Sequence, residues 1–117
     1  MSDQKAEGRG RSLIYTAPDI LRRHWITEID PEARRLKIAR RWLGLKPKTI
    51  VDCSLDECTA VGTIEYKSEG PASYGIYVET GRRHGIPQTD HSYDAAAKVA
   101  TELSAATGLP RRDTTYP

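Results

Sequence analysis

The clearest alternation of polar and apolar positions lies between Ile20 and Leu43, and it predicts a β-hairpin. Asp30 and Pro31 suit a type I turn, because proline pre-sets φ at the second position. With Asp30 facing Ala33, side chains alternate between two faces of the hairpin. The apolar face carries Leu21, Trp25, Thr27, Ile29, Leu36, Ile38 and Trp42. The polar face carries Arg22, His24, Ile26, Glu28, Arg35, Lys37, Ala39 and Arg41.

This register contains one favourable pair and one conflict. Glu28 stands opposite Arg35, and such pairs contribute about 0.2–1 kcal/mol. Arg23 stands opposite Arg40 on the apolar face, where directly opposed like charges are unfavourable. We therefore treat Arg23 and Arg40 as candidate binding residues at a groove or an open barrel end, where an acidic group of a partner would reach them.

The remaining pattern predicts further strands and then one helix. Strands are expected at 12–16, 49–54, 59–67, 72–79 and 82–86. Gly62 interrupts the strand expected at 59–67 like a β-bulge. From Ser92 to Thr107 apolar residues recur every three or four positions, which is typical of an amphipathic helix. Ser92 suits its N-cap, and Gly108 suits the left-handed residue that ends it.

These elements predict a mainly β (α+β) fold. Its core is a strongly bent antiparallel sheet or a small β-barrel of six to seven strands, closed by one C-terminal α-helix, because a long meander curls or closes to protect its edges. A single domain is expected over residues 12–110. Residues 1–11 are expected to form a disordered basic arm and residues 111–117 a loose tail.

The order of these elements resembles the pleckstrin-homology-like (PH-like) domain, in particular the small bacterial members of uncharacterised function. Three stretches carry the resemblance, over about residues 20–110: HWITEIDPEARRLKIARRWLGL, SYGIYVETGRRHGIP, and the helix ending LSAATGLP. The resemblance implies a binding module. Eukaryotic relatives bind inositol phosphates through basic residues around the first hairpin loop, but here that loop is the short, acidic Asp30–Ala33. Phosphoinositide binding is therefore not carried over.

Charge is distributed unevenly along the 117 residues. Residues 1–47 hold eleven Lys/Arg against six Asp/Glu, a net of +5, and residues 48–117 hold seven against ten, a net of −3. The sequence has no apolar run of about 18 residues that would cross a membrane, and the polar N-terminus does not resemble a signal peptide. A cytoplasmic location is the expectation.

Few residues suggest catalysis or metal binding. Cys53 and Cys58 lie five positions apart, which favours small buried thiols over a metal site. His84 and His91, with Asp90, would approach each other near one barrel end and form the alternative site of a small enzyme or ligand-binding barrel. A nucleophile at Cys53 or Ser54 would lack a fixed base. We expect no enzyme activity, no metal and no cofactor.

The basic excess on the hairpin favours a binding role. Its predicted basic face comprises Arg22, Arg35, Lys37 and Arg41. That face lacks the stacking aromatics of single-strand binders, because Trp25 and Trp42 point the other way, so weak nucleic-acid binding is only an alternative hypothesis. The sequence therefore predicts a non-enzymatic binding or adaptor module for a protein or peptide, with acidic partners or an anionic membrane surface using the basic face. Recognition would use the sheet edge, a groove beside the helix, or that face.

Overall fold

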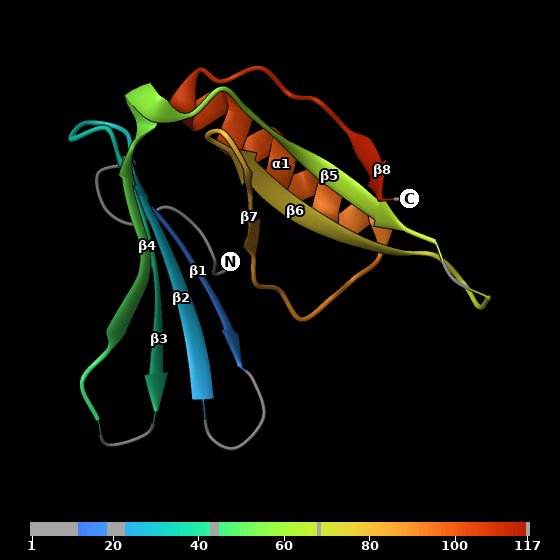
Figure 1. Ribbon diagram of the computed structural model, residues 1–117, viewed down its shortest axis with the longest axis horizontal. Coiled ribbons are helices and arrows are strands. Elements are labelled where there is room, and N and C mark those ends of the chain that lie inside the picture. Colours follow the sequence, from blue (N-terminus) through green and yellow to red (C-terminus); the bar gives the residue numbers. More distant parts are fainter. Residues whose placement is uncertain (1–11, 19–22, 43–44, 68, 117) are drawn as a thin grey trace. The chain divides into compact units, whose positions relative to one another are not determined.

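The structure is a computed structural model that describes residues 12–18, 23–42, 45–67 and 69–116 (Figure 1). It is mainly β, with two four-stranded sheets and one α-helix. The chain divides into two compact units, residues 1–56 with 87–89 and residues 57–86 with 90–117, where the sequence predicts one domain. Each sheet is open and has two edge strands among the described residues, so the barrel stays a prediction.

The first unit contains an antiparallel meander in the order β1-β2-β3-β4. Its strands are β1 (Leu13–Pro18), β2 (Arg23–Asp30), β3 (Arg35–Trp42) and β4 (Lys48–Ser54), followed by the 3-10 turn Leu55–Glu57. One face is buried through Tyr15, Ala17, Thr27, Ile29, Leu36 and Ile38. The strand registers place these six residues on one side, as the alternation predicts for those in the hairpin.

The hairpin register differs by two residues from the one predicted. Asp30 pairs with Arg35, so the loop has four residues. The Asp30 carboxylate accepts hydrogen bonds from the backbone N–H groups of Glu32 and Ala33. Arg34 closes the loop in a left-handed conformation with φ 56°. A shift of two residues keeps every side chain on its predicted face and changes only its cross-strand partner.

Two predicted pairs are therefore wrong. Glu28 faces Lys37 in place of Arg35, which preserves an opposite-charge pair. Arg23 and Arg40 do not face each other, because Arg23 lies opposite Trp42 and Arg40 lies opposite Trp25. The predicted conflict between Arg23 and Arg40 is thereby removed, and Arg40 instead stands opposite another cation, Lys48 of the neighbouring strand β4.

The second unit contains a sheet in the order β7-β6-β5-β8, with the helix packed against β5 and β6 (Figure 1). Its elements are β5 (Ala60–Tyr66), β6 (Ser73–Glu79), β7 (Arg83–Ile86), α1 (Tyr93–Thr107) and β8 (Thr114–Tyr116). The Ser92 side chain accepts the Ala95 N–H, and Gly108 ends the helix with φ 78°. Both caps are confirmed. Buried residues of the helix are Ala96, Ala100, Leu103 and Thr107.

The C-terminal segment, from Arg111 onward, is fixed to the second sheet and contains the strand β8. The expectation of a loose tail is therefore wrong. β8 runs parallel to β5, with Thr114 beside Ile64 and Tyr116 beside Tyr66. Upstream, the Val61 N–H donates to the Pro110 carbonyl and the Arg112 N–H donates to the Val61 carbonyl.

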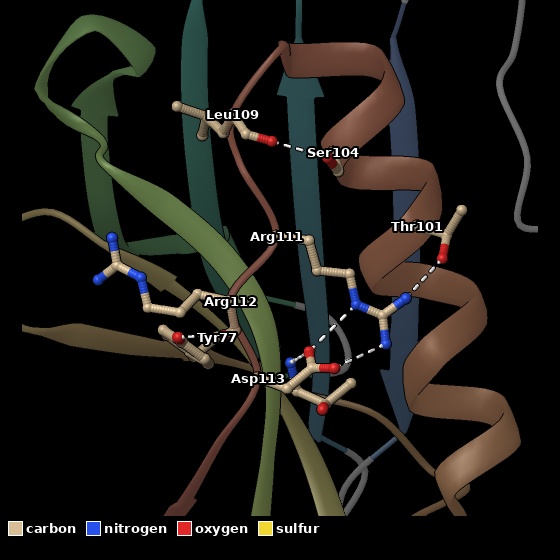
Figure 2. A network of polar contacts seen from close by, with 8 residues as sticks. Tyr77, Thr101, Ser104, Leu109, Arg111, Arg112 and Asp113 are labelled. Atoms are coloured by element: carbon tan, nitrogen blue, oxygen red, sulfur yellow. Dashed lines mark hydrogen bonds and ion pairs between the residues drawn. The ribbon is translucent and has the colours of Figure 1, made fainter.

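Gly62 is explained by this strand and not by a bulge, because the β5–β6 register is continuous past it. A Cβ at Gly62 would overlap the carbonyl oxygen of Arg112. That carbonyl accepts a hydrogen bond of 2.5 Å from the Tyr77 hydroxyl (Figure 2). Burial raises the pKa of Tyr77, and the Glu79 carboxylate adds to this, so the hydroxyl stays a donor. The glycine therefore allows a second backbone to approach closely.

An arginine–carboxylate pair fastens the same segment, and we call it the C-terminal clasp: Arg111 and Asp113 with their partners Thr63 and Thr101 (Figure 2). The Arg111 guanidinium donates to both oxygens of Asp113, at 3.1 and 3.2 Å, and to the Thr101 hydroxyl at 2.8 Å. The Thr63 N–H donates to Asp113 at 3.0 Å. The clasp thus joins the C-terminal segment to β5 and α1.

Candidate anion-binding site

Two arginines and two tryptophans gather on one face at the end of the β2–β3 hairpin. We call this group, Arg23, Trp25, Arg40 and Trp42, the Arg–Trp face. The Arg23 guanidinium carbon lies 5.4 Å from the Trp42 ring centre and 6.0 Å from that of Trp25. The Arg40 guanidinium carbon lies 5.6 Å from the Trp25 ring centre. These are cation–π distances, worth about 0.5–1 kcal/mol each at exposed sites.

The β-sheet geometry explains why these residues meet. Cross-strand partners share a face, so the pairs Trp25–Arg40 and Arg23–Trp42 stack in two neighbouring rows. β4 extends the first row, because Lys48 lies directly opposite Arg40. Three cations therefore share this end of the sheet, and the two rows contain no carboxylate among the described residues.

Arg40 is the most unusual member of the Arg–Trp face. Its side chain is half-buried, and its Nε atom is buried without a hydrogen-bond partner in the part of the chain that the structure describes. Arg34, Arg35 and Arg111 each form an ion pair with an aspartate. A buried donor left unpaired costs about 1–3 kcal/mol. Arg40 is thus held in place by an aromatic ring, and no carboxylate of this chain's described part neutralises its charge.

On the predicted basic face, on the other side of the hairpin, two of the four cations stand beside carboxylates. Arg35 forms an ion pair with Asp52, and Lys37 stands between Glu28 and Asp52 in the registers of its two neighbouring strands. Arg41 lies opposite His24 and is exposed. Arg22 lies outside the described residues.

His84 contacts different residues from the adjacent Asp90 and His91. The His84 Nε2 lies 2.9 Å from the Thr80 hydroxyl oxygen, whereas the His91 carbonyl accepts the Tyr74 N–H. Asp90 accepts the Ser92 N–H, and this hydrogen bond lowers the pKa of Asp90. The described residues contain no group of three His, Cys, Asp or Glu that could hold a metal ion.

Neither Cys53 nor Cys58 forms a disulfide bond. Cys58 is buried and Cys53, on β4, is half-buried.

No helix in the described part of the chain has the length and apolar character needed to cross a membrane. Neither observation adds a catalytic residue.

Comparison with protein-family models, with curated proteins and with solved structures finds no match. The candidate site therefore stands on its own geometry. Sequence reasoning singled out Arg23 and Arg40 but missed Trp25, Trp42 and Lys48 as their companions. Each arginine lies two positions from a tryptophan on the same strand, which puts all four side chains on one face. Which arginine stands opposite which tryptophan follows only from the register.

Proposed function

We propose that this protein is a non-enzymatic binding module that recognises an acidic segment of a partner protein at the Arg–Trp face. The proposal rests on Arg40, a half-buried cation that lies over the Trp25 ring and has no ion-pair partner among the described residues. Arg23 and Lys48 add positive charge beside it. A carboxylate is the group that this arrangement lacks.

The two tryptophan rings are already covered by arginines, which favours an acidic side chain over a nucleic acid base. A guanidinium held near an indole by a cation–π contact keeps its N–H donors, which lie in the plane of the guanidinium. Those N–H groups suit bidentate hydrogen bonds to a carboxylate. A base would need an open aromatic face, but Arg23 and Arg40 already lie over Trp25, and Arg23 over Trp42.

We also propose that the chain has a PH-like fold. A PH-like domain, with a bent sheet or barrel, is supported by a meander of four strands, then one of three, then a single helix. β8, which returns to the edge of β5, is an addition to the expected order. We also propose a cytoplasmic location, and two cysteines that form no disulfide bond, Cys53 and Cys58, support it.

A binding measurement with three probes tests the proposal. The probes are a fluorescent eight-residue peptide of alternating Glu and Thr, a single-stranded oligonucleotide, and vesicles with an anionic lipid. We expect the peptide to bind most tightly, and the affinity to fall as salt screens the charges. Trp25 and Trp42 are the only tryptophans in the sequence, so their emission should change on binding.

Matched variants locate the site. Arg40→Met should weaken peptide binding by about tenfold or more, as expected for a hydrogen-bonded charge pair. Arg41→Met removes the neighbouring arginine from the opposite face and should leave the affinity unchanged. Equal losses for both variants would indicate non-specific charge attraction. Peptide binding that survives Arg40→Met, or preferential binding of the oligonucleotide or vesicles, would contradict the proposal.

A further inference from the structure

β4 is an edge strand with an open side. It pairs with β3, and no other strand of the described chain pairs with its far side. An edge strand presents backbone N–H and C=O groups that can pair with another chain. By contrast, the edge of β5 in the second unit is covered by β8 from the same chain.

The beginning of β4 combines this open backbone with exposed side chains. Lys48, Thr49 and Ile50 are all exposed, and Ile50 retains 44% of its accessible surface. Ile50 is also the extra residue of a β-bulge, because Val51 pairs with Ile38 while Thr49 pairs with Ala39. An apolar side chain at an open edge next to a lysine offers both a hydrophobic and an electrostatic contact.

The Arg–Trp face and this edge are continuous. Ala17, Trp25, Arg40 and Lys48 form one row across all four strands. Neighbouring strands lie about 4.8 Å apart, so a strand added beside β4 would place its next residue in the row about 10 Å from the Arg40 backbone. The long side chains of arginine and glutamate span that separation, and Lys48 lies directly beside the added residue.

We propose that the partner's acidic segment binds as a fifth, antiparallel strand on the edge of β4, with alternate acidic side chains directed to the Arg–Trp face. This inference rests on the proposed function and specifies how its ligand lies. Backbone hydrogen bonds to β4 supply a sequence-independent part of the affinity. Lys48 and Arg40 select a peptide with an acidic residue at every second position, and Ile50 contacts its neutral residues.

Backbone methylation tests strand addition. In an extended peptide, the N–H groups of alternate residues point to the same edge. Two versions of the Glu–Thr peptide are needed, one N-methylated at every Glu and one at every Thr. Only one set of N–H groups faces β4, so one version should bind about tenfold or more weakly and the other should retain its affinity. Equal affinities of the two versions would overturn strand addition.

Hydrogen exchange of the full chain locates the added strand. Bound peptide should slow exchange of the amides in Lys48–Ser54, whereas protection of β1 or β7 would overturn the assignment to β4. Lys48→Glu should weaken binding, and Lys98→Glu, a matched change on exposed helix surface, should not. Binding that depends on Arg40 with no difference between the methylated peptides would refute only this inference. Binding independent of Arg40 would refute the proposed function itself.

Discussion

Arginine has opposite roles in the two units of this protein. In the C-terminal clasp, Arg111 donates to both oxygens of Asp113, and its charge is matched within the chain. In the Arg–Trp face, Arg40 lies on Trp25 and its buried Nε has no partner among the described residues. The first arrangement holds a strand in place. The second keeps a cation oriented without neutralising it, which is what a binding site for an anion requires.

The largest effect should come from closing the space that the C-terminal segment occupies. Gly62→Ala would place a methyl group on the Arg112 carbonyl and separate the segment from β5. We expect the free energy of unfolding to fall by about 2–3 kcal/mol, as for other overpacked sites. Urea denaturation provides the measurement. Gly70→Ala is the matched control, because a Cβ added there would meet no atom within 4 Å apart from the adjoining residues of the chain. Equal stabilities of the two variants would show that the segment does not pack over Gly62.

The stability that the C-terminal clasp contributes should also depend on pH. Burial acts to raise the pKa of Asp113, but hydrogen bonds from Arg111 and Thr63 outweigh it and lower that pKa below its usual value. The stabilisation is therefore present above the unfolded pKa, near 3.9, and is lost as the pH falls through the lower folded value.

Asp113→Asn isolates this contribution. We expect a loss of about 1 kcal/mol at pH 7, because the Asp113 side chain is 44% exposed and solvent screens the pair. The difference from wild type should shrink below about pH 4. Asp56→Asn, at the more exposed pair with Arg34, should cost less than about 0.5 kcal/mol. A constant Asp113→Asn difference from pH 7 to pH 2 would exclude the ion pair as its cause.

A smaller effect tests the hairpin register on which the Arg–Trp face depends. Arg34 has φ 56°, a conformation that favours glycine. Arg34→Gly should therefore be about 1 kcal/mol more stable than Arg34→Ala, since both lose the contact with Asp56 and only alanine keeps the strain. In the two-residue register Arg34 would lie in a strand, where alanine is preferred to glycine. Thermal unfolding of the two variants shows which of them is more stable. A more stable Arg34→Ala would contradict the four-residue loop.

The hairpin illustrates how far the sequence determines the fold. Strict alternation gives the faces of β2 and β3 correctly, because the period of two does not depend on the loop length. The loop length depends on Asp30, whose carboxylate binds two backbone N–H groups and extends the turn to four residues. That local hydrogen bonding competes with the two-residue type I turn. The alternation of polar and apolar residues does not reveal it.

The C-terminal strand and Lys48 escaped prediction for related reasons. β8 has three residues and follows Pro110, so it has no alternation to detect. Its position depends on Gly62, which the sequence presents only as an interruption. Lys48 reaches Arg40 through a bulge that shifts the β3–β4 register at Ile38 and Ala39. Contacts between strands thus decided both features, whereas the helix, whose caps are local, was predicted closely.

One pair of substitutions tests the central contrast most directly. Arg40→Met and Arg111→Met each remove a guanidinium and keep a long apolar side chain. For each variant, the free energy of unfolding and the Kd for the acidic Glu–Thr peptide are measured together. We predict that Arg111→Met loses about 1 kcal/mol of stability and keeps its Kd. Arg40→Met should keep its stability or gain some, because a buried unpaired donor is removed, and lose about tenfold in affinity. An Arg40→Met variant that is destabilised but binds the peptide normally would contradict the account.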